Sequence, residues 1–141
     1  MTFFVDANVL VYSGTPSKWR EACIGVLRAI ARGHADGRTS TAVLEEVWYL
    51  EWRGRAGALG GLTERAYAAL APLLPVTDEI FARALALDAT SIGANDRLHA
   101  ATCLENGLEV ILSADAGFDA VEGIRRVDPL DEDSVAQLLA A

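Results

Sequence analysis

The chain has 141 residues, a mass of 15.0 kDa and a hydrophobic content of 52%, which is enough to bury the core of one domain over residues 1–141. No apolar run approaches the roughly 20 residues that span a bilayer, so we expect no membrane-spanning segment. The N-terminus lacks an export signal, so we expect a cytoplasmic protein. Cys23 and Cys103 lie in apolar helical patterns and are expected to be buried, reduced thiols.

The net charge of −8 is unusual for a protein that binds nucleic acid, but it is distributed unevenly. Residues 1–65 carry 8 basic and 7 acidic side chains, whereas residues 66–141 carry 4 basic and 13 acidic ones. A polyanion is therefore expected to approach the N-terminal half, with a cation screening any acidic site. An acidic surface suits a basic protein partner equally well, so the charge alone does not choose between these ligands.

Strand-like and helix-like segments alternate along the chain, which predicts an α/β fold with a mostly parallel central sheet covered on both faces. Apolar residues at helical spacing from Trp19 to Ile30 predict a first helix, followed by a turn at Asp36-Gly37. The glycine-rich residues 54–61 predict a joint between two helices. Strands are expected at residues 2–5, 38–41, 109–113 and 124–127. Further helices are expected at residues 42–53, 63–73, 78–90, 95–106 and 132–139.

Four acidic residues follow predicted strands or open predicted helices, namely Asp6, Glu46, Asp96 and Asp115. The carboxyl ends of parallel strands share one edge of a sheet, where ligand sites form, so we expect these side chains to meet there. Carboxylates gathered in this way repel one another unless a divalent cation binds between them. The pattern therefore predicts a hard-metal site, which suits phosphodiester hydrolysis because the cation neutralises charge on phosphoryl oxygens.

Adjacent glutamates compete for one position in this site, because neighbouring residues of a helix point about 100° apart. Glu46 borders the apolar stripe of its predicted helix more closely than Glu45 does, so Glu46 is the expected ligand. His99 lies one helical turn after Asp96 on the predicted inward face. We expect a buried, hydrogen-bonded histidine there rather than a direct metal ligand.

Three polar residues near the predicted strand ends have secondary roles. Asn8 either orients Asp6 or a metal-bound water, or only forms the turn after the first strand. Ser113 can donate a hydrogen bond to a carboxylate or a metal-bound water. Asp119 is expected to be an acid of the loop surface rather than a peripheral ligand.

Aromatic and basic residues lie together just before the glycine-rich joint. Trp48 and Trp52 are helical neighbours, and dimer or core packing is favoured for them over stacking on RNA. Arg53 and Arg55 are expected to bind a polyanion such as RNA, or the carboxylates of a protein partner.

Four segments resemble the motifs of the PIN-domain family in order and spacing: Phe4–Leu10, Ser40–Glu46, Asn95–Ala101 and Leu112–Phe118. The length and the near end-to-end coverage are similar to those of a VapC-type toxin of a bacterial toxin–antitoxin pair. The resemblance implies a three-layer α/β/α sandwich and an endoribonuclease that hydrolyses RNA with Mg²⁺ or Mn²⁺.

The same resemblance assigns roles to individual residues and implies partners. Metal-ligand roles fall on Asp6, Glu46, Asp96 and Asp115, and a supporting hydroxyl role falls on Ser113, where many relatives have threonine. It also implies a homodimer and a cognate antitoxin whose tail fills the active-site groove.

Other classes of protein also collect acids at strand ends. A haloacid-dehalogenase-like phosphatase would need a second aspartate where Asn8 stands. A response-regulator receiver would need a late lysine, whereas Lys18 is the only lysine of the chain. Two alternatives stay open: a catalytically silent PIN-like module that binds proteins, and a housekeeping nuclease that is not a toxin.

Overall fold

The computed structural model describes residues 1–55 and 60–140. Its centre is a parallel sheet with the strand order β2-β1-β3-β4. The strands are β1 (Thr2–Val5), β2 (Asp36–Arg38), β3 (Val110–Leu112) and β4 (Arg125–Val127). The side chains of β1 from Phe3 to Val5 and those of Ile111 and Leu112 are fully buried, because helices cover both faces of the two central strands.

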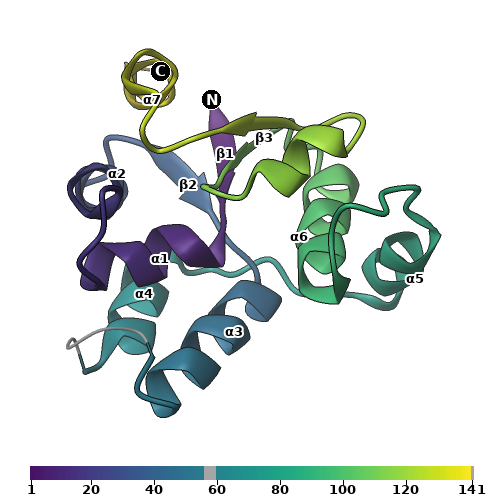
Figure 1. Cartoon of the computed structure of the whole chain (residues 1–141), viewed down its shortest axis with the longest axis horizontal. Helices are drawn as coiled ribbons and strands as arrows, with labels where there is room; N and C mark the ends of the chain where they lie inside the picture. The colour runs from purple at the N-terminus through teal and green to yellow at the C-terminus, as the bar shows by residue number, and fades with distance from the viewer. Residues whose placement is uncertain (56–59, 141) are drawn as a thin grey trace.

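Helices on both sides of the sheet confirm the expected α/β/α architecture. Figure 1 shows α2 and α7 on one side of the strands and α6 with α5 on the other. The elements are α1 (Ala7–Gly14), α2 (Arg20–Ala31), α3 (Thr41–Trp52), α4 (Leu62–Leu70), α5 (Asp78–Ala86), α6 (Ala94–Glu105), the 3₁₀ helix η1 (Ala116–Ala120) and α7 (Glu132–Ala140). None of the described helices is both long and apolar enough to cross a membrane.

The path of the chain opens a crevice at the carboxyl ends of β1 and β3. From β1 the chain runs to β2 on one side and later returns to β3 on the other side of β1. At such a reversal of strand order the following segments leave in opposite directions, which creates a ligand site outside the strand ends. Asp6 directly follows β1, and its backbone N–H donates to the carbonyl of Leu112 at 3.1 Å. Residues that follow β1 and β3 are therefore held side by side.

Two short elements at this edge were not predicted from the sequence. Helix α1 begins directly after Asp6, where only a turn was expected, and η1 begins directly after Asp115. Each aspartate caps the element that follows, because its carboxylate accepts a hydrogen bond from a backbone N–H of the first turn. Both acids thus occupy fixed positions at element boundaries.

The second strand lies at Asp36–Arg38, so the prediction of a strand at residues 38–41 was wrong in position along the chain. Gly37, which was expected in a turn, pairs with Phe3 in the sheet, and a Cβ at this position would collide with the side chain of Ile30. Only glycine fits between this strand and α2. Ser40 serves instead as the N-cap of α3, which begins at Thr41.

Two helices end earlier than predicted. Helix α4 ends at Leu70 rather than at residue 73, because Ala71 precedes a proline and adopts an extended conformation. Helix α5 ends at Ala86 rather than at residue 90, and Leu87 is likewise extended. The expected joint between α3 and α4 is present, with Gly54 and Gly61 at φ values of 68° and 80°. Gly57, which belonged to the same prediction, lies outside the described residues.

Candidate metal centre

Asp6 is 3% exposed at the junction of β1 and α1. Its carboxylate accepts hydrogen bonds from the backbone N–H of Ala7 at 2.8 Å, from Asn8 Nδ2 at 3.1 Å and from Ser113 Oγ at 2.6 Å. Burial raises the pKa of this carboxyl, although the charge of His99 and these hydrogen bonds act in the opposite direction. Asp6 is therefore fixed in orientation but lacks the solvation that its negative charge needs.

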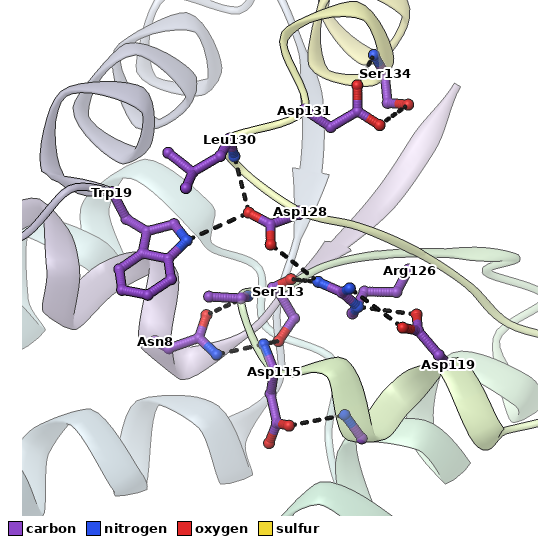
Figure 2. A network of polar contacts seen from close by, with 12 residues as sticks. Asn8, Trp19, Ser113, Asp115, Asp119, Arg126, Asp128, Leu130, Asp131 and Ser134 are labelled. Carbon is purple, nitrogen blue, oxygen red and sulfur yellow. Dashed lines mark hydrogen bonds and ion pairs between the residues drawn. The ribbon is translucent and has the colours of Figure 1, made fainter.

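Ser113 and Asn8 join the end of β3 to the start of α1 (Figure 2). Ser113 Oγ donates to Asp6 and accepts from Asn8 Nδ2 at 3.1 Å and from the backbone N–H of Asp115 at 3.0 Å. Asn8 Oδ1 accepts from the backbone N–H of Ala114 at 3.2 Å. The hydroxyl of Ser113 thus links two of the predicted ligands, and the side chain of Asn8 orients Asp6, one of the roles considered for it.

Asp96 lies in the first turn of α6 and faces the same crevice as Asp115 and Asp6. Burial first, then the charge of Asp6 and a side-chain hydrogen bond with Asp115, together raise the pKa of Asp96 to about 7. The carboxylate of Asp115 is itself held by the backbone N–H of Gly117 at 2.9 Å (Figure 2). Asp6 and Asp115 therefore lie close enough to Asp96 to oppose the ionisation of its carboxyl.

Glu46 reaches the crevice from α3, whereas Glu45 of the same helix is exposed and lines a different groove. The side chain of Glu46 is 28% exposed. Its Oε1 accepts from Asn95 Nδ2 at 3.4 Å, and its Oε2 lies 3.4 Å from His99 Nε2. The choice of Glu46 over Glu45, which rested on the apolar stripe of the helix, agrees with this placement.

A pocket of about 320 Å³ brings the predicted ligands together, although they come from four separate parts of the chain. Its lining includes all four carboxylates, Asp6, Glu46, Asp96 and Asp115. The remaining lining residues are Ala7, Asn8, Val11, Tyr12 and Leu50. Val11 and Tyr12 were not predicted as lining residues, because α1 was not predicted. The apolar residues at positions 9–11, three residues after Asp6, are the signal that could have revealed this helix.

His99 is fully buried beneath the carboxylates, as expected for a histidine on the inward face of α6. Its Nε2 lies 3.8 Å from Asp6 Oδ1 and 3.4 Å from Glu46 Oε2. One ligand atom from each of these three side chains falls within 4.8 Å of the other two. Its Nδ1 is buried and has no hydrogen-bond partner within residues 1–55 and 60–140. A hydrogen-bonded histidine was expected here, but within the described residues Nδ1 has no partner and Nε2 has only a long contact.

The residues of the pocket fit a divalent cation. Carboxylate oxygens are the ligands that hard cations prefer, and the pocket contains four carboxyl groups. The lining residues that the structure describes include no lysine or arginine, so the chain itself does not neutralise this charge inside the pocket. Burial is the first cause of the raised pKa values of Asp6 and Asp96, and a bound cation would compensate the negative charge that burial disfavours.

Asp119 lies outside the pocket and is a surface acid, as favoured from the sequence. Its carboxylate accepts from Arg126 Nε at 2.9 Å and from Arg126 Nη2 at 3.2 Å (Figure 2). Arg126 also donates to the carbonyl of Ser113 at 3.0 Å and to Asp128 at 3.3 Å. Sequence reasoning missed this arginine, which supports the end of β3 from behind the pocket.

The aromatic and basic residues at the end of α3 are on the surface. Trp48 and Trp52 are 66% and 85% exposed, so core packing, one of the roles favoured for them, is wrong. Arg53 and Arg55 are also exposed and do not line the pocket. Arg53 Nη1 donates to the Tyr49 hydroxyl at 3.4 Å, and its guanidinium lies 5.8 Å from the centre of that ring.

Comparisons with known proteins agree with this fold. The family model of the PIN domain matches residues 3–124. VapBC2 from Rickettsia felis, in a structure bound to a DNA fragment from its promoter, has a chain 15% identical with a TM-score of 0.62, covering 90% of this chain and 98% of its own. A chain of FitAcB from Neisseria gonorrhoeae is 20% identical with a TM-score of 0.65, and the match covers 93% of this chain and 99% of that one. PAE2754 from Pyrobaculum aerophilum is 16% identical with a TM-score of 0.64, covering 100% of both chains. No curated protein matches by sequence.

Proposed function

The chain belongs to the PIN-domain family, and from this premise we propose that it is a metal-dependent endoribonuclease that hydrolyses RNA phosphodiester bonds. The observation that carries the proposal is the meeting of Asp6, Glu46, Asp96 and Asp115 in one pocket without a basic side chain among its described lining residues. A structural role alone would not require four carboxyl groups to share so small a space against their mutual repulsion. A bound cation would offset the repulsion among these carboxylates.

The proposed ligands of Mg²⁺ or Mn²⁺ are Asp6, Asp96 and Asp115, with Glu46 binding directly or through water. When bound, the cation activates water for attack on phosphorus and stabilises the charge that develops on the phosphoryl oxygens. Ser113 and Asn8 hold Asp6 in place through hydrogen bonds of 2.6 and 3.1 Å. Since the pKa of Asp96 is raised by burial to about 7, this carboxyl must release its proton before it can bind a cation near neutral pH.

RNA would approach the pocket along α3. Glu46, Leu50 and Arg53 are spaced by four and three residues, so they share one face of that helix. Arg53 follows Glu46 by about 10 Å along the helix axis, which suits contact with a phosphate near the reacting one. We assign Arg53 and Arg55 to phosphate binding because both are exposed and basic beside an acidic pocket. Asn8 lines the pocket and is the third proposed substrate contact.

We further propose that the protein is the toxin of a toxin–antitoxin pair and forms a homodimer. One of the similar structures, that of VapBC2, is named as bound to a DNA fragment from its promoter. The cognate antitoxin would place its tail over the acidic pocket and block it, as the family resemblance implies. We propose a cytoplasmic location for the reaction, which the free thiols of Cys23 and Cys103 support.

Asp96→Asn tests the proposed reaction, because it removes one carboxylate from the pocket while keeping the shape of the side chain. We expect RNA cleavage in Mg²⁺ or Mn²⁺ to fall by at least about 100-fold, and a chelator to abolish cleavage by the parent protein reversibly. Glu45→Gln, which alters the exposed neighbour of Glu46, is the matched control and should cleave RNA like the parent.

A folded Asp96→Asn protein that cleaves RNA at the parental rate would refute the assignment of the site. If the parent binds Mn²⁺ but no preparation cleaves RNA, the alternative of a silent PIN-like protein-binding module is supported. The exposed aromatic side chains Trp48 and Trp52 favour that alternative, because large apolar surfaces mark protein contacts. A housekeeping nuclease would cleave RNA but have no antitoxin gene beside its own.

A further inference from the structure

His99 has no hydrogen bond of ordinary length at either ring nitrogen within the described part of the chain. Its Nδ1 is buried without a partner, and the shortest contact of its Nε2 is 3.4 Å, to Glu46 Oε2. An N–H···O hydrogen bond is normally 2.7–3.2 Å long, and buried polar groups are almost always paired. A fully buried histidine kept only for structure would be expected to have at least one good hydrogen bond.

The spacing around Nε2 is that of ligands to one ion. Two neighbouring ligand atoms of an octahedral Mg²⁺ site lie about 3 Å apart and two opposite ones about 4 Å apart. Nε2 lies 3.4 Å from Glu46 Oε2 and 3.8 Å from Asp6 Oδ1. The three ligand atoms all lie within 4.8 Å of one another. The three side chains are thus spaced to share a cation, whereas the same distances are long for direct hydrogen bonds.

A protonated imidazole would form ion pairs with Asp6 and Glu46 and is the metal-free alternative. The two neutral tautomers of His99 both favour a cation instead. If Nε2 carries the proton, its contact with Glu46 is weak and the lone pair of Nδ1 has no donor. If Nδ1 carries the proton, the lone pair of Nε2 faces two carboxylate oxygens, which repel it. A cation between Nε2 and these oxygens removes that repulsion and also compensates the buried charge of Asp6. The second tautomer is therefore suited to metal binding.

We propose that His99 is a nitrogen ligand of the cation held by Asp6 and Glu46, and that it makes this site favour Mn²⁺ over Mg²⁺. Mg²⁺ takes oxygen ligands almost exclusively, whereas imidazole nitrogen is a common ligand of transition metals. The inference rests on the proposed cation site and adds a ligand to the four carboxylates. It also reverses the expectation from the sequence, which favoured a histidine without direct metal contact.

The chain offers a direct spectroscopic test, since it contains only two histidines, His34 and His99. Electron spin-echo envelope modulation of the Mn²⁺-loaded protein detects nitrogen bound to the metal. We expect a nitrogen signal in the parent protein that changes its frequencies when histidine is labelled with ¹⁵N. The signal should persist in His34→Gln, which alters an exposed residue, and disappear in His99→Gln.

Metal titrations by calorimetry supply the second measurement. His99→Gln should weaken Mn²⁺ binding by at least about tenfold and Mg²⁺ binding by less than about threefold. Bound Mn²⁺ without a histidine nitrogen signal in the labelled parent overturns the role of His99 but leaves the four-carboxylate site intact. A parent protein that binds no Mn²⁺ overturns both this inference and the proposed function. The labelled parent decides the question even if His99→Gln fails to fold.

Discussion

Asp6 serves the fold and the proposed site with the same carboxylate. It caps α1 through the backbone N–H of Ala7, and it is positioned for the pocket by Asn8 and Ser113. The two roles are compatible, because a capping carboxylate keeps free lone pairs. Burial raises the pKa of the Asp6 carboxyl, so its ionised form is unfavourable when no metal is bound.

Asp96→Asn should stabilise the metal-free protein at alkaline pH, although it removes a proposed ligand. The pKa of Asp96 is about 7 in the folded protein against an ordinary value of 3.8, so the folded state holds this proton more tightly than the unfolded state does. The resulting stability is present below about pH 4 and is lost as the pH rises to about 7. Asparagine stays neutral and escapes that loss.

Thermal unfolding in the presence of a chelator measures this effect. At pH 8 the free energy of unfolding of Asp96→Asn should exceed that of the parent by roughly 1–2 kcal/mol, a figure reduced for the partial exposure of the carboxyl. The difference should shrink towards pH 4, and exposed Glu45→Gln should show no comparable change. A variant less stable than the parent at pH 8 would contradict the view that the carboxylates are strained without metal.

Helix α3 connects the pocket with the proposed RNA path, because Glu46 lines the pocket and Arg53 follows the helix at its end. We expect Arg53→Ala with Arg55→Ala to weaken RNA binding and to flatten its dependence on salt. Each lost phosphate contact lowers the slope of log K against log salt by about 0.7 for a single strand, so the pair should lower it by about 1.4.

Binding is best measured in an Asp96→Asn background, in which the RNA is not cleaved. Arg20→Ala with Arg28→Ala is the matched control, since it removes the same charge from α2, where both arginines line a separate groove. An unchanged slope in the Arg53 and Arg55 variant would assign these residues a structural role. Equal effects of both pairs would show only that the net charge matters.

Secondary structure was predicted well where apolar residues recur at a regular spacing, and poorly where tertiary contacts determine the conformation. The central part of α2 and the strand before Asp6 follow from apolar spacing alone. Gly37 misled the prediction, because a glycine beside an aspartate suggests a turn, whereas here the missing side chain makes room for Ile30. Helix α1 was missed because only a turn was expected after Asp6, although the apolar residues at positions 9–11 are a local signal for it. No local signal reveals the contact between Gly37 and Ile30.

At the scale of the whole molecule, convergence of the site depends on strand order. Asp6 and Asp115 become neighbours only because β3 pairs with β1, while β2 occupies the opposite edge of β1. Periodicity predicts parallel strands but not their order. The expectation of a shared pocket rested on the common edge of the strand ends and on the resemblance of four segments to PIN-domain motifs. The structure brings these residues together, and their chemical roles remain proposals.

The exposed aromatic residues of α3 and α4 are the proposed homodimer contact, which we define as Trp48, Trp52 and Tyr67. They are 66%, 85% and 56% exposed, and Trp48 and Tyr67 line one groove of about 800 Å³ between the two helices. A tryptophan buries up to about 200 Å² in a contact, so two of them supply several kcal/mol before the costs of association. A second copy of the chain would cover this surface.

Light scattering after size-exclusion chromatography tests the dimer, and the parent should show about twice the chain mass of 15.0 kDa. Trp48→Ala with Trp52→Ala should give a monomer at the same concentration, because the contact loses its largest apolar side chains. Phe81→Ala with Leu85→Ala is the control, since both residues are exposed on α5, at 52% and 75%, away from this surface. A monomeric parent would contradict the dimer. A tryptophan variant that stays dimeric would place the dimer contact elsewhere and would assign Trp48 and Trp52 to an RNA or antitoxin surface.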